Sequence, residues 1–159
     1  MKKSIFKKLT TGICVVLLTA FSSCSKGEGE GDAPSPSGGR NAKFTVTVTN
    51  APPSAYLSFV VVGLSRDPNE ATVWKVNGVV QNNQNTVSLG KNEFSGNTKT
   101  YVIESVKPLQ NISVGVQCIN VEDLPYQISY KAEINGEVKA DEKGFTVTKN
   151  ADFTKDYTY

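Results

Sequence analysis

The sequence predicts an all-β fold, an antiparallel sandwich of about nine or ten short strands. The main evidence is an alternation of apolar and polar residues, with a period of two, that begins at residue 43. Turn-forming residues interrupt this pattern at intervals of roughly 8 to 12 residues, and no convincing amphipathic helix follows residue 20. With 159 residues, of which 38% are hydrophobic, the chain can form one domain with a modest core.

The first two strands are predicted from residue 43 and over 55–63. In the first strand, apolar side chains share one face, while lysine and threonine occupy the other. Pro52 and Pro53 end it, because proline cannot donate a ladder hydrogen bond. The second strand is apolar on both faces, which predicts a central strand covered on both sides. The inward residues are Phe44, Val46, Val48, Leu57, Phe59 and Val61, and the second face carries Val60 and Val62.

A hairpin is predicted next, with its turn at Asn77 and Gly78. Asn-Gly favours the type I′ turn because both central residues of that turn need a positive φ. The strand before it covers residues 71–76, and Val79 begins the return strand. The amide-rich run 81–85 is interpreted as a loop, and further strands are expected over 86–89 and 100–105, separated by a Gly/Asn loop.

The two cleanest strands are 112–118 and 126–134, which alternate throughout. A second Asn-Gly pair follows at 135 and 136. A plain two-residue turn would place Glu137 opposite the inward Ile134, so we expect a bulge or longer loop that brings Val138 into register. Strands at 145–147 and 153–159 would close the sandwich.

The stretch from Val106 to Val116 contains Pro108 and the start of a strand. It resembles the proline-containing turn and following strand of fibronectin type III domains, although Ile112 stands where that family usually has Tyr. The resemblance covers about 11 of the residues and implies an immunoglobulin-like topology. The Cys-Trp-Cys pattern of antibody domains is absent.

Residues 1–23 are predicted to be an export signal. Basic residues at the start precede an apolar run over 9–20 and then small residues. That run has 12 residues, whereas a membrane-spanning helix needs about 20, so cleavage is favoured over a retained transmembrane anchor.

The sequence Phe21-Ser22-Ser23-Cys24 resembles the lipobox of bacterial lipoproteins, with Phe in place of the usual Leu. The resemblance implies that Cys24 is lipidated and becomes the first residue of the mature chain. More than one acyl chain then gives stable attachment to the membrane. The alternative is an ordinary signal peptide, cleaved nearby, with Cys24 as a spare thiol.

Residues 24–42 are interpreted as the lipidated Cys followed by a flexible tether, and residues 43–159 as the sandwich domain. The tether is rich in Gly, Pro and Ser and has no apolar periodicity. Its acidic residues at 28–32 resemble the Bacteroidetes-type signal that directs lipoproteins to the outer face of the outer membrane. We therefore expect a lipid-anchored outer-membrane protein at the cell surface.

Composition excludes several classes of function. The chain has no His, which removes Ser-His-Asp and Cys-His catalysis and histidine metal sites. Its lysines lie singly along strands, which argues against nucleic-acid binding. No loop has calcium-ligand spacing, and no metal or cofactor is expected. The acidic pairs at 122–123 and 141–142 could serve an enzyme that uses carboxylates alone, and this is the least favoured hypothesis.

Candidate ligand-binding residues are aromatic and amide side chains. Trp74 is expected in the core, with a sugar-stacking role as the alternative, and Cys118 is expected to be a buried, inert thiol. The remaining candidates are expected to be exposed, and they are Tyr56, Gln81, Asn82, Asn83, Tyr157 and Tyr159.

The sequence thus predicts a non-enzymatic, lipid-anchored binding module for a glycan or a protein. The alternative is a structural or accessory subunit of a cell-envelope assembly that docks through an exposed strand edge or an apolar patch.

Overall fold

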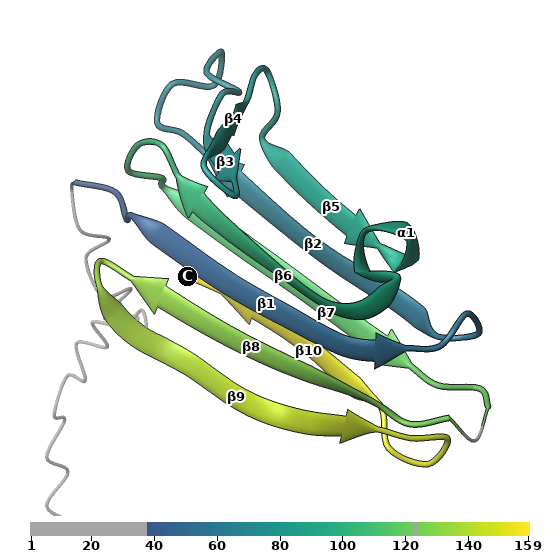
Figure 1. Cartoon of the computed structure of the whole chain (residues 1–159). Coiled ribbons are helices and arrows are strands. Elements are labelled where there is room, and N and C mark those ends of the chain that lie inside the picture. The colour runs from purple at the N-terminus through teal and green to yellow at the C-terminus, as the bar shows by residue number, and fades with distance from the viewer. Residues whose placement is uncertain (1–37, 123) are drawn as a thin grey trace, which may run out of the picture. The chain divides into compact units, whose positions relative to one another are not determined.

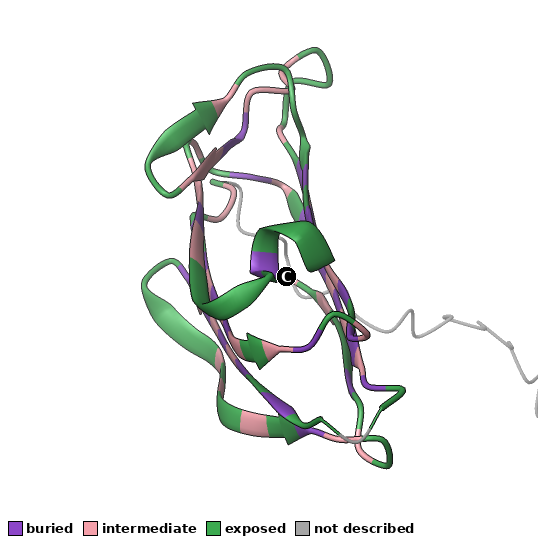
Figure 2. Ribbon diagram, turned by 45° about the vertical axis from the view of Figure 1, so that its right-hand side comes forward, coloured by how far each residue is buried: buried purple, intermediate pink, exposed green. Residues whose placement is uncertain are grey.

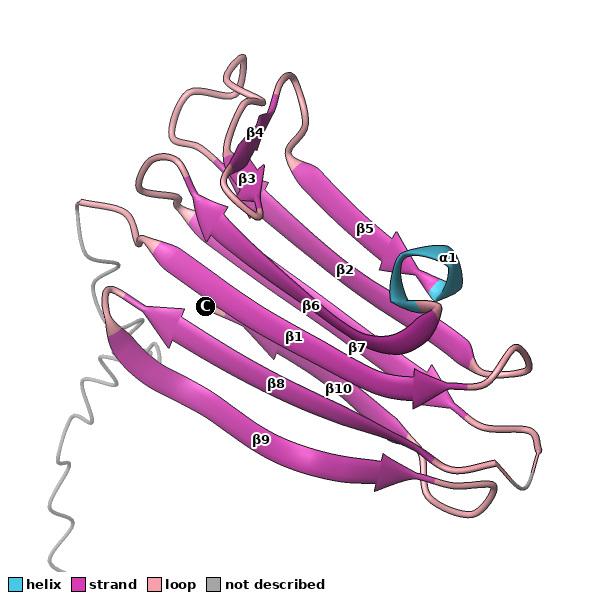
Figure 3. Cartoon of the chain, in the orientation of Figure 1, coloured by secondary structure: helices cyan, strands magenta, loops and turns pink. Residues whose placement is uncertain are grey.

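The computed structural model describes residues 38–122 and 124–159, and these form two antiparallel sheets packed face to face (Figures 1 and 3). The six-stranded sheet has the order β4, β3, β6, β1, β8, β9, and the four-stranded sheet has the order β10, β7, β2, β5. The predicted all-β antiparallel sandwich is confirmed. The strands are β1 Ala42–Ala51, β2 Tyr56–Leu64, β3 Trp74–Val76, β4 Val79–Gln81, β5 Thr86–Gly90, β6 Gly96–Ser105, β7 Asn111–Ile119, β8 Tyr126–Ile134, β9 Glu137–Val147 and β10 Phe153–Thr158, and a short helix α1 covers Lys91–Phe94.

The core lies between the sheets and is built from the inward positions of the alternating strands (Figure 2). Phe44 on β1 and Phe59 on β2 are both buried, and each has its ring about 6 Å from that of Tyr130 on β8. Burying a side chain of this size contributes about 1.5 to 3 kcal/mol. The period of two therefore assigned the core face of these strands correctly.

Trp74 belongs to this core, as expected. Its side chain has no solvent exposure, and its ring centroid lies 6.1 Å from that of Phe44. The indole N–H donates to the carbonyl of Asn85 over 3.0 Å, so the one polar atom of this side chain is satisfied. A role as an exposed sugar platform is therefore wrong.

The hairpin at Asn77 and Gly78 is confirmed. Their φ angles are 48° and 84°, the left-handed values that a type I′ turn requires. Asn77 also fixes the turn on β6, because its Oδ1 accepts the N–H of Val102 and its own N–H donates to the Val102 carbonyl, both over 2.8 Å.

A bulge follows the Asn135-Gly136 turn, as expected, but it does not bring Val138 to the inward face. Asn135 and Gly136 make a plain two-residue turn, which pairs Ile134 with Glu137. Val138 pairs with Glu133 and remains 48% exposed on the outer face. A register shift follows the turn, since Ala132 pairs with Ala140 and leaves Lys139 as the extra residue. The first three residues of β9, an edge strand, are all exposed, so the core does not cover the start of this strand.

Two other expectations need correction. The loop expected before residue 100 contains the short helix α1, where buried Phe94 packs under the turn, and β6 begins at Gly96. In β2, which lies between β7 and β5 as predicted for a central strand, Val60 and Val62 are only half-buried on the outer face. The cover expected on that face is therefore incomplete.

The chain enters the domain at one end of the sandwich. Arg40 exchanges two backbone hydrogen bonds with Leu109, of 2.7 and 2.9 Å, beside the start of β1. We call this the near end. The far end holds the β1–β2, β7–β8 and β9–β10 connections (Figure 1). Among the described residues, no helix has the length and apolar character to span a membrane.

Candidate functional site

The predicted ligand-binding residues lie in three separate places. Tyr56 begins β2 at the far end and is 52% exposed, as expected. Gln81, at the end of β4, and the following Asn82 and Asn83 lie near β3 at the opposite side of the domain. Tyr157 and Tyr159 lie on and directly after β10. No single surface of the described residues therefore unites all six side chains, and Cys24 lies outside the described residues.

The two C-terminal tyrosines are less exposed than predicted. Their rings stack on each other, with centroids 6.0 Å apart and planes 8° apart, and Tyr157 also stacks on Tyr130 at 5.2 Å. Both side chains pack against the core. The alternation of β10 turns them toward the space between the sheets, so neighbouring aromatic rings occupy faces that a sugar would need.

The Gln81 side chain serves its own turn, whereas the side-chain amides of Asn82 and Asn83 make no hydrogen bond within the described residues. Gln81 Nε2 donates to the Val79 carbonyl over 2.8 Å, and the N–H of Asn83 donates to Thr72 Oγ1 over 2.9 Å. Asn83 has a φ of 56°, a left-handed value that asparagine tolerates better than most residues. These contacts account for part of the polar run without a ligand.

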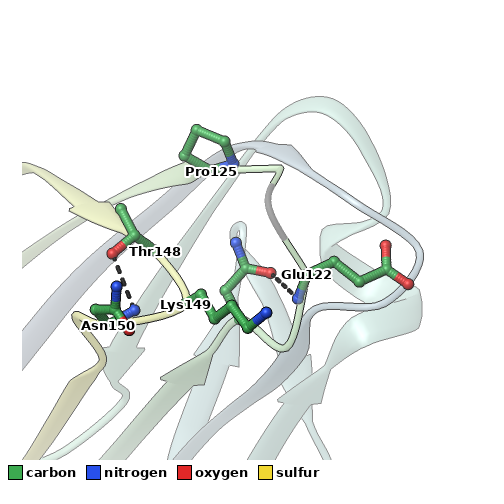
Figure 4. Close-up of a pocket in the computed structure, with 6 residues that line it drawn as sticks. Glu122, Pro125, Thr148, Lys149 and Asn150 are labelled. Atoms are coloured by element: carbon green, nitrogen blue, oxygen red, sulfur yellow. Dashed lines mark hydrogen bonds between the residues drawn. The ribbon is translucent and has the colours of Figure 1, made fainter.

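A different polar surface lies at the far end, where two shallow hollows share Pro125, and Figure 4 shows the first of them. The first is bounded by the β7–β8 and β9–β10 connections and the second by the ends of β1, β8 and β9. Amide and hydroxyl side chains make up half of the lining residues of the first hollow and all but Pro125 in the second. The first is lined by Asn120, Glu122, Pro125, Thr148, Lys149 and Asn150, and the second by Thr49, Asn50, Pro125, Tyr126, Gln127 and Thr146.

Hydrogen bonds fix the loops around these hollows. Buried Asn120 donates to the Leu124 carbonyl over 2.8 Å and accepts the N–H of Glu122 over 3.1 Å. Thr148 and Ala151 exchange backbone hydrogen bonds of 3.0 and 3.2 Å, and the Tyr126 hydroxyl donates toward the Ile119 carbonyl over 3.3 Å. These bonds tie Asn120 to Leu124 and Glu122, and Thr148 to Ala151, at the rim of the hollows.

Several polar groups at the far end are not used by the fold. Within residues 38–122 and 124–159, the side chains of Asn50, Gln127 and Asn150 make no hydrogen bond, and Lys149 and Glu122 make no ion pair. By contrast, Asn135 at the near end accepts the N–H of Asn41 over 2.8 Å. The far-end groups are therefore available to a ligand.

Exposed apolar side chains accompany this surface. Val121 and Leu124, in the β7–β8 connection, are 61% and 59% exposed, and Tyr56 pairs through its backbone with neighbouring Ile119. Sequence reasoning missed the far-end set because its members come from distant segments and each looks like an ordinary turn residue. The one available signal was that several of these residues follow strands predicted to end at the same side of the sandwich.

The lone thiol of the described residues is placed as expected. Cys118 is buried on the inward face of β7, and burial raises the pKa of its thiol to about 12. A thiol of this kind is protonated at neutral pH and weakly nucleophilic.

The fold is similar to solved structures of Bacteroidales proteins. The calcium-bound form of a protein from Parabacteroides distasonis is 17% identical with a TM-score of 0.55, and the match covers 82% of this chain and 99% of that chain. DUF4425 family structures from Bacteroides ovatus and Bacteroides vulgatus are 14% and 11% identical, with TM-scores of 0.51 and 0.53, and each match covers 77% of this chain and 94% of the other. At such identities the likeness shows the fold alone. No protein-family model and no curated protein matches the sequence.

The calcium bound in the Parabacteroides structure raises the question of a metal site here. Calcium takes about 6 to 8 oxygen ligands, commonly including several carboxylates. In the part of the chain that the structure describes, no three His, Cys, Asp or Glu side chains come together. The described residues do not fit a carboxylate-rich calcium site.

Proposed function

We propose that this protein is a lipid-anchored, surface-exposed binding module of the outer membrane, without enzymatic activity, that holds a glycan or protein partner at its far end. The observation that carries the proposal is the pair of far-end hollows, whose lining includes the side-chain amides of Asn50, Gln127 and Asn150, which make no hydrogen bond within the described residues. They lie at the end opposite to the one where Arg40 leads the chain into the domain.

A glycan suits this surface better than a protein does. Amide and hydroxyl groups can donate and accept hydrogen bonds with sugar hydroxyls. Tyr56, Val121 and Leu124 add apolar area beside them. The hollows are shallow, which suits a chain of sugars lying across the surface better than a small molecule enclosed by it.

The anchor rests on Cys24 and the lipobox-like sequence before it. Replacement of Cys24 by Ala is expected to abolish acyl labelling and to release the protein from the membrane fraction. For the protein without substitutions, protease treatment of intact cells is expected to remove the domain from the cell surface. If Cys24→Ala stays membrane-bound with unchanged labelling, the lipoprotein assignment is wrong, and full protection from protease would place the domain on the periplasmic side.

The ligand test is a glycan-array screen with two matched double variants. Lys149→Ala with Asn150→Ala alters the far end, whereas Asn82→Ala with Asn83→Ala alters the polar run near β4. We expect binding by the parent, a loss of at least about tenfold in the first variant, and little change in the second. The screen includes Ca²⁺ and EDTA conditions because the similar Parabacteroides structure is calcium-bound. A loss confined to the second variant would move the site to residues 81–83.

A further inference from the structure

Four strands lie at the edges of the two sheets, and they differ in how well they are protected against pairing with another chain (Figure 1). Edge strands are usually protected by charges, bulges or shortness. β9 carries five charged residues and two register shifts. β10 carries Lys155 and Asp156, and β4 has only three residues. These three edges are poor templates for another strand.

The fourth edge strand, β5, has none of these protections. Its five residues, Thr86–Gly90, contain no charge and no proline, and its register with β2 is continuous. Val87 and Leu89 are buried in the core, while Thr86 and Ser88 are exposed. The outer side of β5 therefore presents an uncharged edge on a strand that two buried side chains anchor to the core.

The backbone groups that β5 leaves free follow from its ladder with β2. The Gly63 N–H donates to the Asn85 carbonyl over 2.8 Å, so these opposite residues form a hydrogen-bonded pair. Such pairs alternate along an antiparallel ladder. Thr86, Ser88 and Gly90 consequently direct their N–H and C=O groups away from β2. The Glu93 carboxylate accepts the Gly90 N–H over 2.8 Å, which leaves Thr86 and Ser88 as the free positions.

We propose that a second copy of this chain pairs with β5, antiparallel and about a two-fold axis at Val87. In this register Thr86 lies opposite Ser88 of the second copy, and both N–H and both C=O groups of each edge find partners. The free edge spans two positions, so two copies related by a two-fold axis satisfy every free group of both edges, and the contact is self-complementary. The paired segment 86–88 carries no charge, so no like charges oppose each other across it. The far-end ligand surface takes no part.

The first test is disulfide trapping between two tagged variants produced in the same cell. Opposite residues of a hydrogen-bonded antiparallel pair have Cα atoms about 5.5 Å apart, which a disulfide can span. Thr86→Cys and Ser88→Cys should therefore form a mixed dimer on mild oxidation, at least about tenfold more than either variant alone. Thr154→Cys with Asp156→Cys, equally spaced on β10, is the matched control, and the parent chain sets the background from its own cysteines.

The second test is Ser88→Pro. Proline removes the N–H that points away from β2 and leaves the β2–β5 ladder intact, so the variant should fold, as far-UV circular dichroism will show. Sedimentation of the parent should show concentration-dependent dimers, and the variant should remain monomeric. The proposal is overturned if the β10 pair crosslinks as strongly as the β5 pair, if Ser88→Cys crosslinks to itself as strongly as to Thr86→Cys, or if the folded Ser88→Pro protein still dimerises. Because glycan binding is measured separately, these results do not depend on the proposed function.

Discussion

Gly63 lies directly against the indole of Trp74. A Cβ atom built on Gly63 would come within 2.6 Å of Trp74 Cζ2 and within 2.7 Å of Leu109 Cδ1. The carbonyl of Asn85 accepts both the Gly63 N–H, over 2.8 Å, and the Trp74 indole N–H, over 3.0 Å. The close approach of β2 to Trp74 thus depends on the absence of a side chain at position 63.

Gly63→Ala should therefore destabilise the domain. The added methyl group overlaps a fixed ring in a packed core, which typically costs about 1 to 3 kcal/mol. Calorimetry should show a lower unfolding temperature. Gly115→Ala is the control, because the nearest atom to its Cβ is Oδ1 of the Asp156 side chain at 3.3 Å, which can move. Equal stability of Gly63→Ala and the parent would contradict the packing described here.

Tyr126 and Tyr130 should respond differently to loss of the hydroxyl. The Tyr126 hydroxyl donates toward the carbonyls of Ile119 and Tyr56, at 3.3 and 3.4 Å, whereas the buried Tyr130 hydroxyl has no partner in hydrogen-bonding geometry among the described residues. Tyr126→Phe should lower the free energy of unfolding by about 0.5 to 1.5 kcal/mol, and Tyr130→Phe should leave it equal or higher. Urea denaturation measures both, and the reverse order would refute this assignment.

Stability should fall at alkaline pH. Burial raises the pKa of the Cys118 thiol from 9.0 to about 12, and burial also raises the pKa of the Tyr126 and Tyr130 phenols. The unfolded chain releases these protons near their usual values, so above those values it binds fewer protons than the folded chain, and the free energy of unfolding decreases with pH. We expect a plateau below about pH 8.5 and a decline from about pH 9 to 12. In Cys118→Ala, the free energy of unfolding should decline less steeply with pH at the start of this range. An unchanged slope would show that the thiol does not contribute to the decline.

The Cys118 thiol should react slowly in the folded protein. A buried, protonated thiol is neither accessible nor nucleophilic. A thiol reagent at pH 8 should label position 118 only after denaturant is added, with Cys118→Ala providing the background from other cysteines. Rapid labelling of the native protein would show that β7 opens readily.

The strands were predictable because their signal is local. A period of two identifies which face of β1, β7 and β8 is buried, and Asn77 with Gly78 identifies a hairpin by its backbone preference alone. The same local rule failed at Val138, since it assumes that every apolar residue at a strand start must face the core. An edge strand that extends past the core removes that requirement.

The sequence alone determined the class of fold and the buried face of the main strands, because alternation and turn chemistry act over a few residues at a time. Only the tertiary structure decided that residues from the β1, β7 and β9 ends share one surface, that Tyr157 and Tyr159 are covered by neighbouring rings, and that β5 is the unprotected edge. The physical reason is that strand order and pairing are set by contacts between segments far apart in the chain, and no short stretch of sequence records those contacts.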